Sequence, residues 1–476
     1  MQSVTTEAML GHLDRGRLDA RYWTLFALLA VGAALDFFDF FVVGYLVAVV
    51  GPQWHLTYGQ SSLMLLGGGL GAICGALVWG PLSDAWGRKA MLVAGSFVCA
   101  IAAGSIALVR DGDWMTFAVL RFFVGVGLAG CATAITALIV EYTPTRNRTV
   151  VTSLLIVFAT FGSFLAALTS ANLLGVLGWR GVATLGLVPA LMGFVYIFAL
   201  PESARWLAVK GRFADARTTV AWTLRAPLDT IPLPTVPPPI APRASLSELL
   251  HHPRLFAFVG LTWLGLATAI YGMLLWGPTV VALLLGITPR QAAAYFVYVT
   301  AAGLTGKVLF SFLAQWLGRK RCGEVTAYGA AVALALAAYS YEPVFMIGVP
   351  VFVLAMIVTS LFLEGEASNI TPWAVEAYGV RLGARAAGLS QAANGCGKVV
   401  GPLCLALIAG ADNFVSPKAT AQAVTPAFLF LAACMLLVGL ACTFLGPETA
   451  GKPIAQDTAP GPLPDTIANP TSGAIY

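Results

Sequence analysis

The chain has 476 residues, of which 58% are hydrophobic and only 10% are charged, and its formal net charge is +5. Soluble proteins are about 25% charged and need a polar surface, so this composition excludes an ordinary soluble domain. The apolar runs are long and continuous, whereas a membrane β-barrel would show segments of ~10 alternating residues. The composition therefore predicts an all-α membrane protein.

The first half of the chain carries six apolar runs, and a membrane-spanning helix needs ~20 such residues. We expect spans at 22–50, 61–80, 90–109, 114–140, 150–176 and 181–200. A long loop follows, in which Phe213–Leu224 is expected to form a short amphipathic helix. Its proline-rich stretch from Asp229 to Pro242 is typical of an extended linker.

The second half repeats this organisation and completes a predicted set of twelve membrane-spanning helices. We expect its spans at 255–285, 291–316, 323–341, 344–366, 384–410 and 425–446. The chain then divides into an N-terminal tail, two six-helix bundles joined by a linker, and a C-terminal tail. These five parts are predicted at residues 1–21, 22–200, 201–253, 254–446 and 447–476.

Basic residues are distributed unevenly between the two sets of loops. One set holds about twenty lysines and arginines, and the other holds only Arg110, Arg180, Arg290 and Lys418. Since basic loops face the cytoplasm, both termini are expected there, in a multi-pass protein of the plasma membrane, and more specifically of a bacterial inner membrane. The same loops account for the net positive charge without a nucleic-acid partner.

Three short motifs recur in the same order in both halves, which predicts two pseudo-symmetric bundles. The pairs are Gly80–Lys89 with Ser311–Lys320, Glu141 and Arg146 with Glu376 and Arg381, and Pro201–Ser203 with Pro447–Thr449.

These motifs, together with the stretch from Arg121 to Gly127, resemble the signatures of the major facilitator superfamily, and the resemblance runs from about Arg21 to Lys452. The acidic stretch from Asp36 to Asp39 is similar to that of its aromatic-acid/proton symporters and related metabolite/proton symporters. Neither the fifth nor the seventh predicted span contains glutamine, unlike sugar porters. The second half departs from the superfamily pattern at Gln315, where an Asp is usual, and at Gly379, where Pro is common.

Asp36 and Asp39 lie within the first span, where burying a charge costs at least ~2.5–3.5 kcal/mol. Their spacing of three places both on one face of a helix, and two close carboxyls suit proton uptake near neutral pH. The resemblance implies that Arg121, early in the fourth span, assists proton transfer. The alternative for these three residues is a structural charge pairing that stabilises the bundle.

Lys398 lies in the middle of the eleventh span, where the resemblance implies a basic residue that binds the substrate. A lone cation beside a central cavity suits an organic anion, although pairing with Glu364 or Glu366 is the alternative. Other predicted substrate contacts are Gln391, Asn394, Glu364, Glu366, Tyr271, Tyr298 and Lys307. The tyrosines could instead fill the core, and Lys307 could extend to the membrane surface.

The repeated charges at the predicted cytoplasmic helix ends are expected to form an ion-pair network that closes that side. They are Asp84, Arg88, Glu141, Arg146, Glu202, Arg205, Glu376 and Arg381. The alternative, charges that only set the topology, explains the arginines but not the repeated acids.

The expected function is secondary active transport, by alternating access, of a small organic anion such as an aromatic or other carboxylic acid, in symport with protons. A sugar, polyol or other neutral-metabolite porter or facilitator and a transporter-like receptor remain alternatives. The sequence has no Walker-type phosphate loop and no nucleophile elbow, which argues against ATP drive and against an enzyme. We expect a monomer with no cofactor and no bound metal, driven by the proton gradient and embedded in a lipid bilayer.

Overall fold

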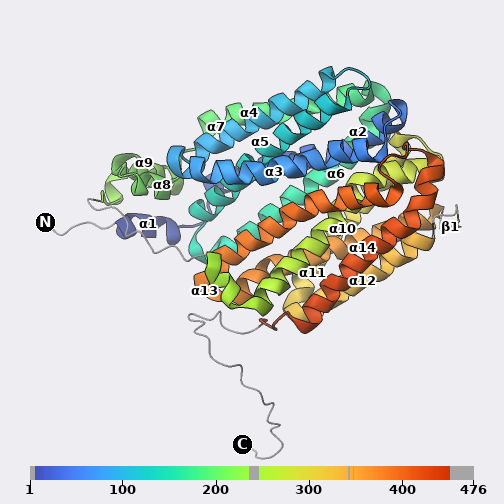
Figure 1. Ribbon diagram of the computed structural model, residues 1–476. Coiled ribbons are helices and arrows are strands. Elements are labelled where there is room, and N and C mark those ends of the chain that lie inside the picture. Colours follow the sequence, from blue (N-terminus) through green and yellow to red (C-terminus); the bar gives the residue numbers. More distant parts are fainter. Residues whose placement is uncertain (1–5, 235–245, 341–343, 347, 451–476) are drawn as a thin grey trace, which may run out of the picture.

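The computed structural model describes residues 6–234, 246–340, 344–346 and 348–450, except for the side chains of Thr149, Leu246, Val380, Arg381 and Ala384. The predicted tail beyond Ala450 and part of the predicted linker lie outside these residues. In the described part, two helical bundles lie side by side, as Figure 1 shows.

The first bundle is built from helices whose starts are fixed by polar caps. In α2 the side chain of Asp19 accepts the main-chain N–H of Tyr22, and in α3 Thr57 and Gln60 form a reciprocal capping box. Short 3₁₀ turns join several of the helices. The bundle consists of α2 (Ala20–Gln53), α3 (Tyr58–Trp86), α4 (Arg88–Ser105), α5 (Trp114–Tyr142), α6 (Arg148–Thr184) and α7 (Val188–Ala199).

Helices of the second bundle begin with similar polar caps. In α11, Thr288 and Gln291 form a capping box equivalent to the one in α3. Between α12 and α13, the strands β1 (Phe345–Met346) and β2 (Val349–Pro350) pair as a small antiparallel hairpin. The helices are α10 (Pro253–Leu285), α11 (Pro289–Leu317), α12 (Arg319–Tyr339), α13 (Val351–Ala409) and α14 (Pro417–Phe444).

Two of these helices run past the end of one membrane crossing into the next, α13 through the whole of it and α6 only through its first turns before α7. Gly178 in α6 and Gly379 in α13 have positive φ of 66° and 74°, a conformation that glycine adopts without a steric penalty, and each interrupts its helix. Among the described residues, eleven helical segments are long and apolar enough to span a membrane. Because the segment Val150–Ala199 is divided at Gly178, the predicted twelve crossings are confirmed.

The boundaries of the tenth span were predicted incorrectly. The expected span at 344–366 instead begins at Val351 and continues to Gly379. The polar residues after Phe362 had suggested an end, but they lie inside the bundle, where they have polar partners. Glu364 and Glu366 are therefore in mid-helix.

A small helical cluster covers one end of the first bundle (Figure 1). It contains α1 (Thr6–Asp14), α8 (Ala204–Val209) and α9 (Phe213–Leu224), and its core includes Met9, Leu13 and Leu207. The prediction of a helix at Phe213–Leu224 is confirmed. Two further 3₁₀ turns, Leu228–Thr230 and Leu246–His251, follow. The segment expected to be an N-terminal tail thus includes a packed helix.

The two bundles meet mainly along three helix pairs, α3 with α13, α2 with α10, and α6 with α11, and α2 also touches α11. We call the end of the bundles where the described chain begins and ends the terminal face. The opposite face carries the loop between α2 and α3 and the β hairpin (Figure 1).

Candidate functional site

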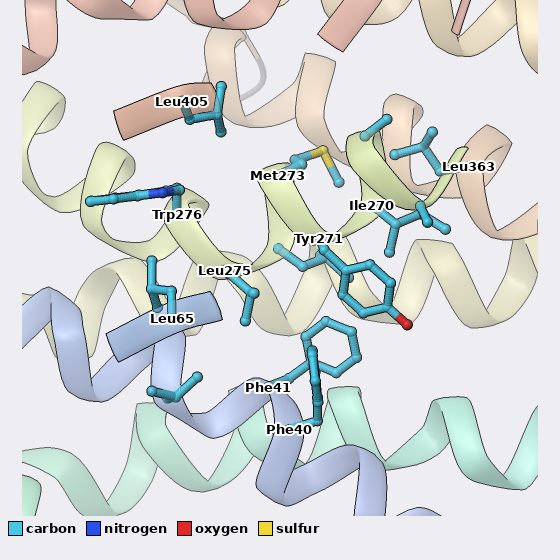
Figure 2. Close-up of a cluster of buried hydrophobic side chains, with 14 of the residues drawn as sticks. Phe40, Phe41, Leu65, Ile270, Tyr271, Met273, Leu275, Trp276, Leu363 and Leu405 are labelled. Atoms are coloured by element: carbon cyan, nitrogen blue, oxygen red, sulfur yellow. The ribbon is translucent and has the colours of Figure 1, made fainter. Parts of the chain in front are cut away.

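A central cavity of about 440 Å³ lies between the two bundles. Asp36 and Phe40 of α2 line it from the first bundle, and Tyr271 of α10 and Lys398 of α13 line it from the second. The rest of its wall is mainly small or apolar. Figure 2 shows the rings of Phe40 and Phe41 directed toward Tyr271, which stacks on Phe41 with an interplanar angle of 9°.

Lys398 faces aromatic rings instead of an acid. Its Nζ lies 5.0 Å from the ring centroid of Phe40 and 5.3 Å from that of Tyr271, both within cation–π range. Among the described residues it forms no ion pair, so the alternative pairing with Glu364 or Glu366 is not observed. An unpaired ammonium group beside aromatic faces can bind an anion that carries an apolar body.

Asp36 and Asp39 have different surroundings, although both are buried. Asp36 lines the central cavity, whereas Asp39 lies behind it, where its Oδ2 accepts a hydrogen bond from Cys99 Sγ at 3.4 Å. Arg121 donates to the main-chain carbonyls of Asp39, at 2.8 Å, and Phe40, at 3.2 Å. The Arg121 side chain thus binds the backbone of α2. Among the described residues it makes no ion pair with Asp36 or Asp39.

A glycine triplet in α3 brings the two basic groups close to one helix. A Cβ on Gly68 would lie 3.1 Å from Arg121 Nη2, and one on Gly69 would lie 3.0 Å from Lys398 Cβ. Gly67 similarly faces α5. This triplet was not among the predicted functional positions, although three consecutive glycines in an apolar run indicate close helix approach.

Glu364 and Glu366, the two acids predicted to contact the substrate, have partners outside the central cavity. Glu364 pairs with Lys307 at 2.7 Å, and Lys307 also donates to Thr160 of the first bundle at 2.6 Å. Glu366 is fully buried and accepts from Thr326 and from Cys442 Sγ at 3.6 Å. Neither acid lines the central cavity.

The other predicted substrate contacts differ in position. Gln391 and Asn394 lie on α13 toward the terminal face, about two turns and one turn from Lys398 respectively, and their side chains are 3.5 Å apart. Tyr298 is 64% exposed and does not line the central cavity. Of the eight predicted substrate contacts, the structure brings Lys398 and Tyr271 together there.

The predicted gate charges form one cluster in the first bundle. Arg88 pairs with Asp84 at 3.1 Å and with Glu141 at 3.4 Å, and Glu141 also accepts from Ser203. Glu202 accepts the main-chain N–H groups of Arg88 and Lys89 at 2.9 and 3.1 Å. The carboxylates thereby tie the start of α4 to the end of α5 and to the loop after α7.

An equivalent cluster in the second bundle involves two residues that the sequence analysis did not select. Arg319 pairs with Glu376 at 2.7 Å, and Glu448 accepts the main-chain N–H groups of Arg319 and Lys320. Burial alone would raise the pKa of Glu448, but the main-chain N–H groups of Ala450, Lys320 and Arg319 hold it below its usual value. Both residues lie in the repeated sequence motifs, so the repeat could have identified them as members of a second charged cluster.

The remaining predicted gate residues are not part of these clusters. Arg146 hydrogen-bonds the neighbouring Asn147, and Arg205 pairs with Asp14 at 2.7 Å. The side chain of Arg381 lies outside the described residues. In the part of the chain that the structure describes, each cluster stays within its own bundle, and no ion pair joins the two.

The bundles are joined at the opposite face by main-chain hydrogen bonds. Tyr58 N donates to Asn413 O, Gly59 N to Ala411 O, and Val415 N to Leu56 O, each at 2.9 Å. The Tyr58 hydroxyl also bonds that of Thr420 at 2.6 Å. We call these contacts the opposite-face seal; they join the start of α3 in the first bundle to the loop between α13 and α14 and the start of α14 in the second.

Comparison with known proteins agrees with this arrangement. A sequence profile described as Major Facilitator Superfamily matches residues 29–347. The niacin transporter of Acinetobacter baylyi is 27% identical over 443 residues, which cover 90% of this chain and 95% of that protein. The 4-hydroxybenzoate transporter of Pseudomonas aeruginosa is 30% identical over 194 residues, 40% of this chain and 43% of that protein.

The fold is shared with a solved transporter. The partially occluded inward-open structure of the xylose transporter from E. coli aligns with a TM-score of 0.69 and 18% identity, over 91% of this chain and 100% of that one. At this level of identity the likeness concerns the fold alone.

Proposed function

The chain belongs to the Major Facilitator Superfamily, and we propose that it is a secondary transporter that carries a small organic anion through the central cavity together with protons. The observation that carries this proposal is the unpaired Lys398 between Phe40 and Tyr271. A carboxylate can bind the ammonium group while an apolar or aromatic body packs on the rings. The relatives named for niacin and 4-hydroxybenzoate transport support this substrate class.

Proton coupling is part of the proposal because of the charges around the cavity. A carboxylate entering a cell against an inside-negative potential costs ~2.3 kcal/mol per 100 mV. One co-transported proton removes that cost. Asp36 lines the same cavity as Lys398, so it can take up a proton from the space that the substrate occupies. Asp39 and Arg121 lie behind it and influence its charge.

The proposed orientation places the basic terminal face in the cytoplasm of a bacterial cell. The opposite-face seal would then close the cavity toward the outside, and the cavity would exchange with the cytoplasm in this state. The charged clusters of the terminal face would come together when the cavity opens outward. Such alternation around a central site is the general mechanism of transporters with repeated bundles.

The test is uptake by the purified protein reconstituted in liposomes. Radiolabelled nicotinate and 4-hydroxybenzoate are offered with and without an inward proton gradient, and xylose serves as the neutral solute. We expect the gradient to drive at least one of the two acids above equilibrium. Uptake of xylose alone would support a sugar porter instead. Binding of an acid without any uptake would support a receptor.

A further inference from the structure

A second cavity lies behind α2, on the side away from the second bundle. It has a volume of about 190 Å³ and lies between α2, α4, α5 and α7. Its polar lining consists of Asp36, Ser96, Cys131 and Tyr196. Asp36 also lines the central cavity, so this one carboxyl group borders both spaces.

The Asp36 carboxyl group lacks a donor among its neighbours. The residue is only 9% exposed, and its Oδ2 is buried with no hydrogen-bond partner among the residues that the structure describes. Ser96 uses its hydroxyl hydrogen for Leu92 O at 2.8 Å, and Tyr196 uses its own for Leu28 O at 3.2 Å. Both hydroxyl oxygens therefore retain acceptor lone pairs but have no hydrogen left for the acid.

We propose that the second cavity is a water-binding site that hydrates the Asp36 carboxylate from behind and so sets the pH at which this acid binds its proton. One water molecule can donate to Oδ2 and to Ser96 Oγ or Tyr196 Oη, while the thiol hydrogen of Cys131 is directed at Leu92 O at 3.8 Å. Buried waters typically have two to four such partners and need roughly 10–15 Å³ of space for a water-sized sphere. The second cavity offers about 10 Å³ by this measure, which is room for a single water. This inference rests on the proposed role of Asp36 in proton coupling.

No charged group takes the place of this water. The titratable groups around Asp36 are Asp39 on the same helix, Cys99 on α4, Cys131 and Arg121 on α5, Tyr196 on α7, and Lys398 across the central cavity. Arg121 is engaged with main-chain carbonyls, and Lys398 lies over the aromatic rings. Neither makes an ion pair with Asp36 among the described residues.

The position of this water separates proton binding from solute binding. A solute in the central cavity displaces the solvent that Asp36 meets there. Water in the second cavity is unaffected, because α2 lies between the two spaces. Asp36 can then keep one hydrogen-bond donor while the transporter is loaded, and its charge does not depend only on the solute.

The test compares two substitutions of similar size at Cys131. The double variant Ser96→Ala/Cys131→Val removes polar groups that face the water and fills its space. Cys131→Ser keeps a polar group there, and Ser163→Ala removes a buried hydroxyl of the same bundle that does not line the cavity. The Asp36 carboxyl band is measured by infrared spectroscopy of the protein in liposomes. It is identified as the band that is absent from Asp36→Asn.

We expect the pH at which this band is half-converted to rise by about one pH unit in the double variant, because the charged form loses a hydrogen bond. Cys131→Ser and Ser163→Ala should titrate as the unmodified protein does. An unchanged titration of the double variant would overturn the water site. If that variant does not fold, as judged by thermal unfolding in detergent, Ser96→Ala alone is titrated, and an unchanged midpoint again overturns the site.

This titration needs no solute, so it separates the two proposals. If the unmodified protein accumulates neither nicotinate nor 4-hydroxybenzoate under a proton gradient, the proposed function fails whatever the band does. If uptake is driven by protons but the band is insensitive to the cavity variants, only the water site is wrong.

Discussion

At the scale of single residues, the site depends on how two charged groups are held. Within the described part of the chain Lys398 has no acid partner and lies over two rings, while Asp36 faces the same central cavity. An unpaired cation is available to a ligand, whereas a salt-bridged one, such as Lys307 with Glu364, must first be released.

Replacing Lys398 with methionine keeps most of the side-chain volume and removes the charge. We expect the KM for a carboxylate substrate to rise at least about tenfold, because a hydrogen bond to a charged group contributes ~1.5–3 kcal/mol. Uptake by reconstituted protein measures this change. Lys418→Met, an exposed lysine of the opposite face, is the matched control. An unaltered KM for Lys398→Met would contradict anion binding at this residue.

Asp36→Asn removes the proposed proton-binding group of the central cavity with little change in shape. We expect it to abolish accumulation driven by a pH gradient while solute exchange across the membrane continues, because exchange needs no net proton movement. On the sequence alone Asp39 is slightly favoured for this role, because it lies deeper in the predicted first span. The structure favours Asp36, since Asp39 does not line the cavity. Gradient-driven accumulation by Asp36→Asn would place the proton site elsewhere.

At the scale of helices, α6 and α11 are joined across the two bundles by a hydrogen bond from Lys307 to Thr160. Thr160→Val should remove this bond and leave the Lys307–Glu364 pair, so the state closed at the opposite face becomes up to about tenfold less favoured. Distances between spectroscopic labels at Gln53 and Asp412, on either side of the opposite-face seal, would report the shift. Thr160→Ser keeps the hydroxyl and should show the original distances.

The helix α1 is attached to the first bundle through Asp14, which pairs with Arg148 at 2.6 Å and Arg205 at 2.7 Å. Burial alone would raise the pKa of Asp14, but these arginines and Thr145 hold it below its usual value. The attachment is therefore complete above the unfolded value of about 3.9 and is lost as the pH falls through the lowered pKa. We expect Asp14→Asn to speed hydrogen exchange in residues 6–14 at neutral pH, but not at a pH below both values.

Much of the helical architecture can be predicted from the sequence, but the lateral position of side chains cannot. Apolar runs and repeated motifs indicate the twelve crossings. These spans are apolar on all sides, so their periodicity does not show which face meets a cavity. Glu366 was therefore expected near the substrate, although its partners lie inside the second bundle. Lys398 and Asp36 could be identified because mid-span charges are costly and rare.

At the scale of the whole molecule, transport requires the opposite-face seal to open. Thr57 and Phe414 form an antiparallel bridge across it, and Cα atoms in such pairs are about 4.5–5.5 Å apart, a separation that suits a disulfide. We expect the Thr57→Cys/Phe414→Cys variant to lose uptake on oxidation and to regain it on reduction. Each single variant, treated with the same oxidant, should continue to transport. Uptake by the fully crosslinked protein would show that the seal need not open.

The opposite-face seal also has a consequence for how this end of the protein can evolve. Apart from the hydrogen bond between the Tyr58 and Thr420 hydroxyls, its bonds come from peptide groups, which nearly every amino acid supplies, so most other side chains in the two loops can be exchanged without loss of these bonds. Proline is the exception at Tyr58 and Val415, because it has no N–H to donate. Gly59 is also restricted, since a Cβ there would lie 3.0 Å from Ala411 O. Natural selection on these loops should therefore act on their length and on a few positions, while the remaining residues are free to diverge.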